Sequence, residues 1–163
     1  MVSSKQYLVS STQYAQSGEQ WTRKIKILLS LIVTLCCFNH SYAQFEIPDK
    51  PKFQTSVYDY YNLLNSSQKQ SLEQKLIRYA DTTSTQIVLA IISSTKGEEI
   101  KYLGANWGHK WGIGGSKEND NGIFILLARD DRKISINAGY GVEHLLTDAM
   151  SKRIIERDII PYF

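Results

Sequence analysis

Two short, continuous apolar segments constrain the fold of this chain more than any other feature of its sequence. They are QIVLAII, at residues 86–92, and GIFILLA, at residues 122–128. Their length and β-branched content favour strands that are covered on both faces. Between them, residues 98–110 carry apolar side chains at helical spacing. A strand, a helix and a second strand in this order form a crossover unit, so we expect the two strands to be parallel.

The remaining elements surround this unit. KISINAG, at residues 133–139, alternates apolar and polar side chains, which predicts a half-exposed strand paired antiparallel with its predecessor. A helix capped by Ser66 or Ser67 is expected to end near Thr83, and another is expected from Asp148 to about Arg157, with Met150 turned inward. The sequence therefore predicts a three-layer α/β sandwich, in which helices flank both faces of a small mixed sheet.

The N-terminal region has the pattern of an export signal. The basic segment RKIK, residues 23–26, precedes twelve apolar residues at Ile27–Phe38, and a small-x-small cleavage site follows at Ser41–Ala43. Twelve helical residues rise about 18 Å, which is too short for a bilayer core of about 30 Å. We therefore expect residues 23–43 to be a signal peptide, cleaved near Ala43–Gln44, that makes the protein periplasmic or secreted. An uncleaved anchor and a buried helix are the alternatives.

Cleavage at this point divides the chain into four expected parts. These are a polar N-terminal extension (1–22), the signal (23–43), an extended leader (44–55) and one domain (56–163). Cys36 and Cys37 both lie inside the signal, so the mature chain has no disulfide or thiolate site. A lipid-attachment site at Cys36 is disfavoured because the bulky Leu35 precedes it.

The net charge also falls mainly on the N-terminal region. Residues 1–43 carry four of the 19 basic residues and one of the 16 acidic residues. The remainder of the chain therefore has as many acidic as basic residues. A neutral body gives no electrostatic reason to expect a nucleic acid partner.

Several short motifs, in their order and spacing, resemble the TPM domain family over about Ser56 to Phe163. The most specific are Trp-x-Ile-Gly at Trp111–Gly114, Asp-Asn-Gly at Asp120–Gly122, Asp-Arg at Asp131–Arg132 and Gly-x-Gly-x-Glu at Gly139–Glu143. The resemblance implies an extracytoplasmic α/β sandwich that holds calcium among acidic loops. The resemblance also suggests phosphatase activity, which has been claimed for the plant branch of the family. Family members usually continue past a Pro-x-Phe motif, whereas this sequence stops there, so we expect the domain to be truncated at its C-terminus.

The expected topology brings one group of acidic residues together. Asp120 and Asn121 precede one strand of the hairpin and Glu143 follows the other, so these residues should share one edge of the sheet. Asp148 lies a few residues beyond, and Asp59 could fold over the same edge. We expect these five residues to form a calcium site, because calcium takes six to eight oxygen ligands. The alternative is that they are ordinary turn and helix-cap residues.

A hydrolase would need more than these oxygens. A phosphoryl acceptor requires a cation and a positive group, but Arg129 and Arg132 are expected at the other end of the hairpin. His144 and His109 are the remaining acid–base candidates, and Gly139-x-Gly141 lacks the third glycine of a dinucleotide site. The sequence therefore favours an exported, calcium-binding module that interacts with or maintains envelope or membrane proteins and uses no nucleotide cofactor. A metal-dependent phosphatase of the same fold is the alternative.

Overall fold

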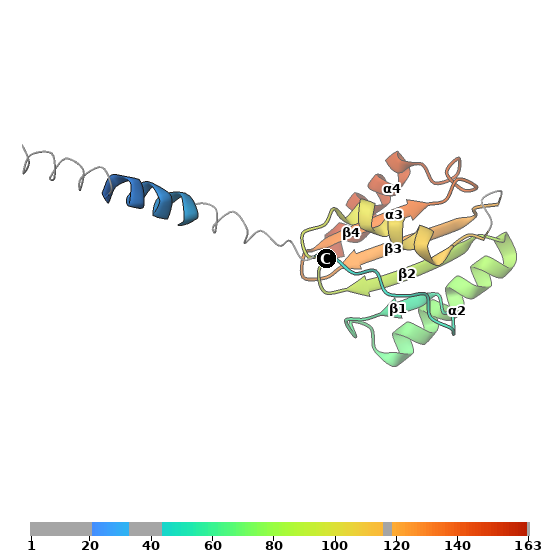
Figure 1. The fold of residues 1–163 in the computed structure, drawn as a ribbon. Coiled ribbons are helices and arrows are strands. Elements are labelled where there is room, and N and C mark those ends of the chain that lie inside the picture. The colour runs from blue at the N-terminus through green and yellow to red at the C-terminus, as the bar shows by residue number, and fades with distance from the viewer. Residues whose placement is uncertain (1–20, 33–43, 116–118, 163) are drawn as a thin grey trace, which may run out of the picture. The chain divides into compact units, whose positions relative to one another are not determined.

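The computed structural model describes residues 21–32, 44–115 and 119–162 (Figure 1). The chain divides into two compact units, Met1–Tyr42 and Ala43–Phe163. In the first unit, residues 21–32 form a helix, while the rest of the expected signal and its cleavage site lie outside the described residues. Among the described residues, no helix is both long enough and apolar enough to cross a membrane.

The second unit is built on one four-stranded sheet in the order β1-β2-β3-β4. The strands are β1 (Val57–Asp59), β2 (Gln86–Ile92), β3 (Gly122–Ala128) and β4 (Lys133–Ala138). β1, β2 and β3 are parallel, and β4 is antiparallel to β3. The predicted parallel pair and the predicted hairpin are therefore confirmed, with strand bounds that match the two apolar segments.

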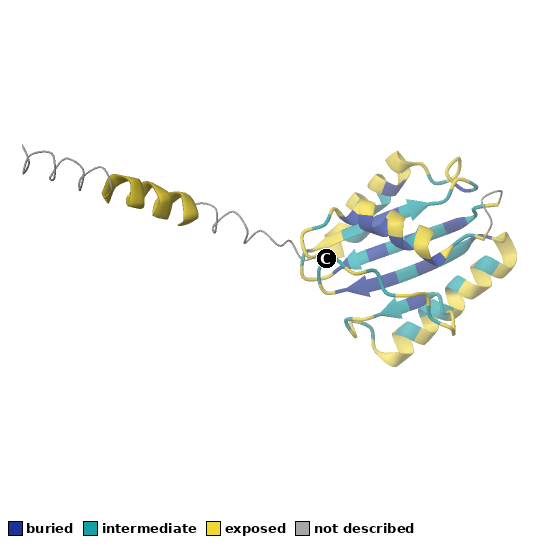
Figure 2. Cartoon of the chain, viewed as in Figure 1, coloured by how far each residue is buried: buried dark blue, intermediate teal, exposed yellow. Residues whose placement is uncertain are grey.

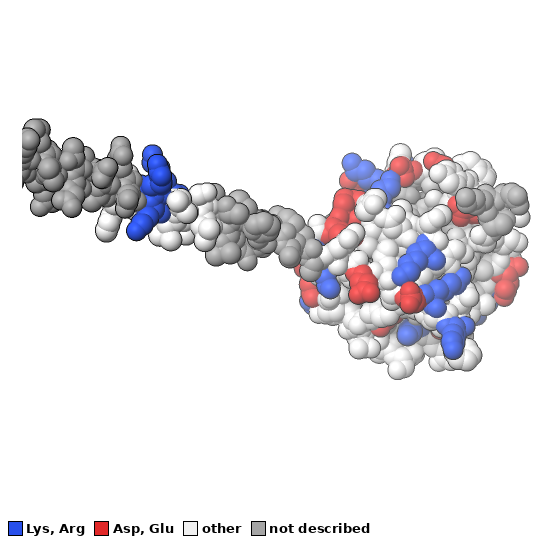
Figure 3. Space-filling model, in the orientation of Figure 1, with Lys and Arg blue, Asp and Glu red and all other residues white. Residues whose placement is uncertain are grey.

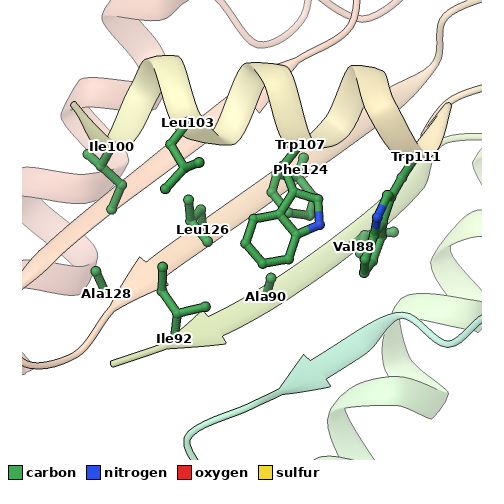
Figure 4. Packing of buried hydrophobic residues seen from close by; sticks show 10 residues of the cluster. All are labelled: Val88, Ala90, Ile92, Ile100, Leu103, Trp107, Trp111, Phe124, Leu126 and Ala128. Atoms are coloured by element: carbon green, nitrogen blue, oxygen red, sulfur yellow. The ribbon is translucent and has the colours of Figure 1, made fainter. Parts of the chain in front are cut away.

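The main core lies between the sheet and α3 (Ile100–Trp111), which crosses the sheet in Figure 1. Every second residue of β2 and β3 faces this helix, as the alternating burial along β3 shows (Figure 2). Trp107, at 0% exposure, lies near the centre of this layer, and Phe124 packs against it with ring centroids 5.7 Å apart. The other members of the cluster (Figure 4) are Val88, Ala90, Ile92, Ile100, Leu103, Trp111, Leu126 and Ala128.

The other face of the sheet is packed more loosely. α2 (Ser66–Thr83) contacts β2 and β1 from this side, and Leu76 and Tyr79 of the helix border the same surface hollow as Ile87 of β2. No residue of α2 is fully buried. The helix begins at a capping box in which Asn65, rather than the expected Ser66 or Ser67, accepts a hydrogen bond from the Gln68 N–H.

The extended leader is part of the folded unit. Phe45 and Ile47 pack against the α3 core, and the Phe45 N–H donates to Glu98 Oε1 at 2.9 Å. Further along, the Trp111 indole N–H donates to the Pro48 carbonyl at 2.9 Å. The leader thus runs along α3 and covers apolar surface that would otherwise contact water.

The structure adds one strand that the sequence did not indicate and corrects two local expectations. The aromatic segment after the leader contains β1, which the sequence did not reveal as a strand. The last helix, α4 (Asp148–Ile154), changes to π-helical geometry at Ile155–Ile159 and then to a 3₁₀ turn at Ile160–Tyr162. Met150 is 49% exposed rather than turned inward, and Ser151 is the buried residue of α4.

Candidate functional site

The two edges of the sheet hold different sets of acidic residues. β3 begins next to Asp120 and Asn121 and ends next to Arg129, Asp130 and Asp131. A strand of this length separates its two ends by about 20 Å. We call the end with Asp120 the amino edge and the end with Asp131 the carboxyl edge. The acidic residues are therefore divided into two groups, one at each edge.

At the amino edge, the start of β3 is held against the loop that follows β4. The Tyr140 N–H donates to Asp120 Oδ2 at 3.0 Å, and the Gly141 N–H donates to the Asp120 carbonyl at 2.9 Å. A side chain at Gly139 would overlap the Asp120 carboxylate, and one at Gly141 would overlap the Asn121 amide oxygen. The glycines of this loop are thus needed for close approach, which fixes the orientation of Asp120.

The turn between α3 and β3 completes this edge. Gly112 ends α3 with a φ of 60°, and Gly114 has a φ of 100°, a backbone conformation that favours glycine. The Gly114 N–H donates to Gln86 Oε1 at 3.0 Å, and its carbonyl accepts the Asn121 N–H at 3.3 Å. The Trp-x-Ile-Gly and Asp-Asn-Gly motifs are therefore in contact, because Gly114 of the first accepts the hydrogen bond that Asn121 of the second donates.

A cleft of about 540 Å³ opens beside Asp120, between the second half of α3 and the start of β3 and end of β4. Its polar side chains are Asn106 and His109 from α3, Asp120, Asn137 from β4, and Tyr140. Glycines and the apolar residues Ala105, Ile113, Phe124 and Ala138 supply the rest of the lining. No lysine or arginine of the described residues lines this cleft. Asp120 is the only acidic side chain in the described lining.

One buried polar atom among the cleft-lining residues has no hydrogen-bond partner. The Asn137 amide nitrogen donates to Ser135 Oγ at 3.0 Å and to the Phe124 carbonyl at 3.3 Å. Its Oδ1, however, is buried without a donor among the described residues. A buried, unpaired acceptor costs free energy unless water or a ligand supplies a donor. Asn137 and Asn106 were not anticipated as site residues, and the only sequence signal was the polar position of Asn137 in an alternating strand.

At the carboxyl edge, Asp131 has a structural role. Its carboxylate accepts the Thr95 N–H at 2.7 Å and the Ser94 hydroxyl at 2.8 Å. Thr95 is fully buried, so Asp131 supplies the partner for a buried donor in the loop after β2. These hydrogen bonds, the Thr95 N–H first, lower the pKa of Asp131 below the ordinary aspartate value. The Asp-Arg motif therefore includes a residue that fastens the β3–β4 turn to the β2–α3 loop.

The basic residues of the hairpin turn lie at this same edge. Arg129 donates to Asp130 Oδ1 at 3.0 Å and lies over the Tyr61 ring, 5.5 Å from its centroid. Tyr61 also donates to Asp130 Oδ1, at 3.2 Å. Arg129 and Arg132 are thus separated from Asp120 by the length of β3, as expected.

The five expected metal ligands do not gather in one place. Asp59 ends β1, and because β1 is parallel to β2 and β3, it lies at the carboxyl edge, so its expected position beside Asp120 is wrong. Its carboxylate accepts the N–H groups of Tyr61 and Leu64 at 3.2 and 2.8 Å. Asp148 pairs with Lys101 of the first turn of α3 at 2.8 Å, which draws it away from the Asp120 loop.

Asp120 and Asn121 therefore remain together at the amino edge, and the exposed Glu143 follows in the loop after Gly139–Gly141. Within residues 21–32, 44–115 and 119–162, no three His, Cys, Asp or Glu side chains form a group able to hold a metal ion. The donor chemistry at this edge suits calcium, but the number of side-chain oxygens already in place is too small for a preformed site.

The fold of this chain resembles two solved structures. One is the solution NMR structure of the N-terminal domain of a protein from P. gingivalis, with 26% identity, a TM-score of 0.62, and coverage of 67% of this chain and 69% of that one. The other is the N-terminal domain of a Corynebacterium glutamicum protein, also solved by NMR. It has 19% identity and a TM-score of 0.50, with coverage of 71% of this chain and 78% of that one, and it supports the fold alone.

No curated protein matches the sequence. The model of the TPM domain matches residues 57–163, which is most of the chain and includes both edges of the sheet. The chain therefore belongs to the TPM domain family.

Proposed function

We propose that the chain is an exported, calcium-binding TPM module that acts by binding or maintaining proteins of the cell envelope. The observation that carries this proposal is the arrangement of the amino edge, where Asp120 is fixed by the Tyr140 N–H beside an open cleft. The acidic residues of the carboxyl edge, in contrast, are engaged in hydrogen bonds that hold loops together.

The side-chain oxygens of Asp120 and Asn121 would coordinate the calcium ion. Both residues belong to the short segment that Gly114 and Gly141 hold in place. Calcium also accepts backbone carbonyls and water as ligands. Carbonyl groups of the surrounding loops and water would therefore complete its coordination shell on binding. Glu143 follows in the next loop and is exposed, so it is free to turn toward the ion.

The surface beside the cleft supports a role in binding proteins. Tyr140 is 84% exposed at its rim, and Leu145 in the same loop is 63% exposed. Tyrosine side chains are enriched at protein-binding surfaces. On the face seen in Figure 3, positive and negative side chains of this unit are interspersed, so a partner would not be selected by a strong field of one sign.

Export rests on the N-terminal sequence. A basic segment, a short apolar segment and a small-x-small cleavage site precede the folded unit. Edman sequencing of protein secreted to the periplasm or medium tests this part, and the expected first residue is Gln44. Protein that stays in the cytoplasm and keeps its N-terminal segment would contradict export.

The calcium part is tested by isothermal calorimetry of the unit Ala43–Phe163 with calcium chloride. We expect saturable binding and a melting temperature that rises with calcium concentration. The substitution Asp120→Asn should abolish binding, whereas Asp130→Asn, which removes the same charge at the carboxyl edge, should not. Absence of binding to folded protein, or equal losses in both variants, would refute a calcium site at the amino edge.

Phosphatase activity is the alternative outcome. It would require turnover of p-nitrophenyl phosphate that chelators suppress and that Asp120→Asn abolishes. Arg129 and Arg132 lie at the other end of β3 from Asp120, so they are badly placed to stabilise charge on a phosphoryl group there. Turnover with these two properties would replace the binding proposal with an enzymatic one.

A further inference from the structure

We infer that signal cleavage completes a contact at the start of the leader, in which the new α-ammonium group of Gln44 pairs with the Glu98 carboxylate. The inference rests on the export part of the proposed function and adds a consequence of processing for the stability of the folded unit. It follows from the position of Phe45, from the charges around it and from the change that cleavage makes at Gln44.

Phe45 is fixed by three contacts that place its backbone beside Glu98. Its N–H donates to Glu98 Oε1 at 2.9 Å. Its ring packs against Trp107 with ring centroids 5.5 Å apart, and Lys96 Nζ lies 5.9 Å from the Phe45 ring centroid. The start of the leader is therefore held at Glu98, and the residue before Phe45 cannot lie far from this carboxylate.

The α-nitrogen of Gln44 is within reach of the same carboxylate. Consecutive backbone nitrogens are joined by three bonds, so they lie no more than about 4 Å apart. The Gln44 nitrogen therefore lies within about 7 Å of Glu98 Oε1. Gln44 is exposed, so rotation about its ψ angle can turn a free ammonium toward Glu98. A carboxylate has about four acceptor sites, so Glu98 can accept this donor as well as the Phe45 N–H.

The charged groups around this position favour an ammonium. They are Glu46 in the leader, Lys96, Glu98, Glu99 and Lys101 in the loop and first turn that lead into α3, and Asp131 in the β3–β4 turn. Four are acidic and two are basic, so the local balance is negative, and Lys101 is already paired with Asp148. Glu99 and Asp131 accept backbone N–H groups, and Glu46 is exposed. Glu98 is therefore the half-buried carboxylate best placed to bind the new charge.

Cleavage before Gln44 changes one group of the folded unit. In the precursor, the Gln44 nitrogen belongs to a neutral peptide bond. After cleavage it is an amine with an ordinary pKa of about 8, so it is mostly charged at neutral pH. The far end of the leader is held in either form, because the Trp111 indole N–H donates to the Pro48 carbonyl. The new pair fixes the end nearest the cleavage site, so the mature domain is more stable than its precursor.

The test compares two forms of residues 44–163 that differ in one charge. This part of the chain is compact and resembles domains whose structures were solved in isolation by solution NMR. A tag whose protease leaves no residue of its own yields the free ammonium. Glutaminyl cyclase yields the control, in which the α-nitrogen displaces ammonia from the Gln44 side-chain amide and becomes part of a neutral lactam. At pH 6 we expect the ammonium form to melt about 3 °C higher, as for one partly exposed ion pair.

The pH dependence of this difference follows from the α-amino group. Pairing with Glu98 raises the pKa of the amine in the folded state above its unfolded value of about 8. The stabilisation is therefore fully present below the unfolded pKa and is lost as the pH rises through the folded pKa. The two forms should have nearly equal melting temperatures at pH 10.

Two variants locate the pair. Glu98→Gln keeps an oxygen for the Phe45 N–H but removes the charge, so it should abolish the difference between the two forms. Glu46→Gln removes the same charge from the exposed neighbour of Phe45 and should leave most of the difference in place. Equal melting temperatures of the two wild-type forms at pH 6, or a difference that persists in Glu98→Gln, would overturn the inference.

Edman sequencing of the exported protein tests the cleavage site separately, because the melting experiment sets the N-terminus itself. If the exported chain begins at Gln44 and the melting difference is absent, only the inference fails. A first residue other than Gln44 would overturn the cleavage assignment and, with it, this role of Glu98, whatever the melting temperatures.

Discussion

Replacing Asp131 by alanine should destabilise the domain far more than replacing its neighbour Asp130. Asp131 accepts the Thr95 N–H at 2.7 Å and the Ser94 hydroxyl at 2.8 Å. The Thr95 hydroxyl also lies 3.0 Å away, but its single hydrogen has a nearer acceptor in the Glu98 carbonyl at 2.8 Å. Two hydrogen bonds, rather than three, therefore depend on Asp131.

The expected cost follows from what the substitution leaves behind. Thr95 is fully buried, so its N–H would lose its partner at a cost of about 1–3 kcal/mol. Loss of the partly exposed Ser94 bond adds about 1 kcal/mol, because water can replace it in part. The sum is about 3 kcal/mol, which corresponds to about 12 °C in melting temperature for a domain of this size.

Urea unfolding and thermal melts of the unit Ala43–Phe163 measure this cost, with Asp130→Ala as the matched control. Asp130 is exposed, and its partners Arg129 and Tyr61 can be solvated after the change, so we expect a loss below about 1 kcal/mol. Equal stabilities of the two variants would refute a structural role for Asp131.

The pH dependence of the same protein provides a second check. The pKa of Asp131 is lowered in the folded state, so the stabilisation from this carboxylate is present above the unfolded pKa of about 3.9. It is lost as the pH falls below that value, because protonation removes the charge that the folded state favours. Acid unfolding should therefore be flatter in Asp131→Ala than in the wild type. An unchanged slope would contradict the lowered pKa.

Three further substitutions test the core and the amino edge. Trp107→Phe should change stability by less than about 1 kcal/mol, because the lost packing is offset by removing a buried indole N–H that has no partner in the described part of the chain. Trp111→Phe should cost about 1 kcal/mol more than Trp107→Phe in urea unfolding, since it breaks the hydrogen bond to the Pro48 carbonyl. A larger loss in Trp107→Phe than in Trp111→Phe would contradict this reasoning. Gly139→Ala should cost about 1–3 kcal/mol because its methyl group overlaps Asp120, and wild-type stability would show that this contact is not tight.

The sequence predicted the elements whose apolar pattern is continuous. β2 and β3 are almost uninterrupted runs of apolar residues, so their composition alone marks them as strands, although the face of β3 that points away from α3 is only partly buried. β1 has only three residues and carries Tyr58 and Asp59, so neither its composition nor its length indicated a strand. Its place in the sheet is set by pairing with β2, and a local sequence pattern carries no information about that pairing.

The same distinction applies to the candidate site. Asp120 and Asn121 could be placed at one edge because the hairpin topology follows from neighbouring segments. Asp59 was misplaced because its edge depends on the parallel pairing of β1. Asp148 was expected near Asp120, but it pairs with Lys101, which is distant in sequence. Residues 139–147 are long enough to allow either position, so spacing could not decide between them.

The two edges of the sheet should respond differently to calcium if the amino edge binds it and the carboxyl edge is structural. Amide chemical shifts recorded during a calcium titration of ¹⁵N-labelled Ala43–Phe163 test it most directly. We expect saturable shifts concentrated at residues 119–122 and 139–143, with little change at residues 94–95 and 129–132. Shifts concentrated at the carboxyl edge, or none in folded protein, would contradict it.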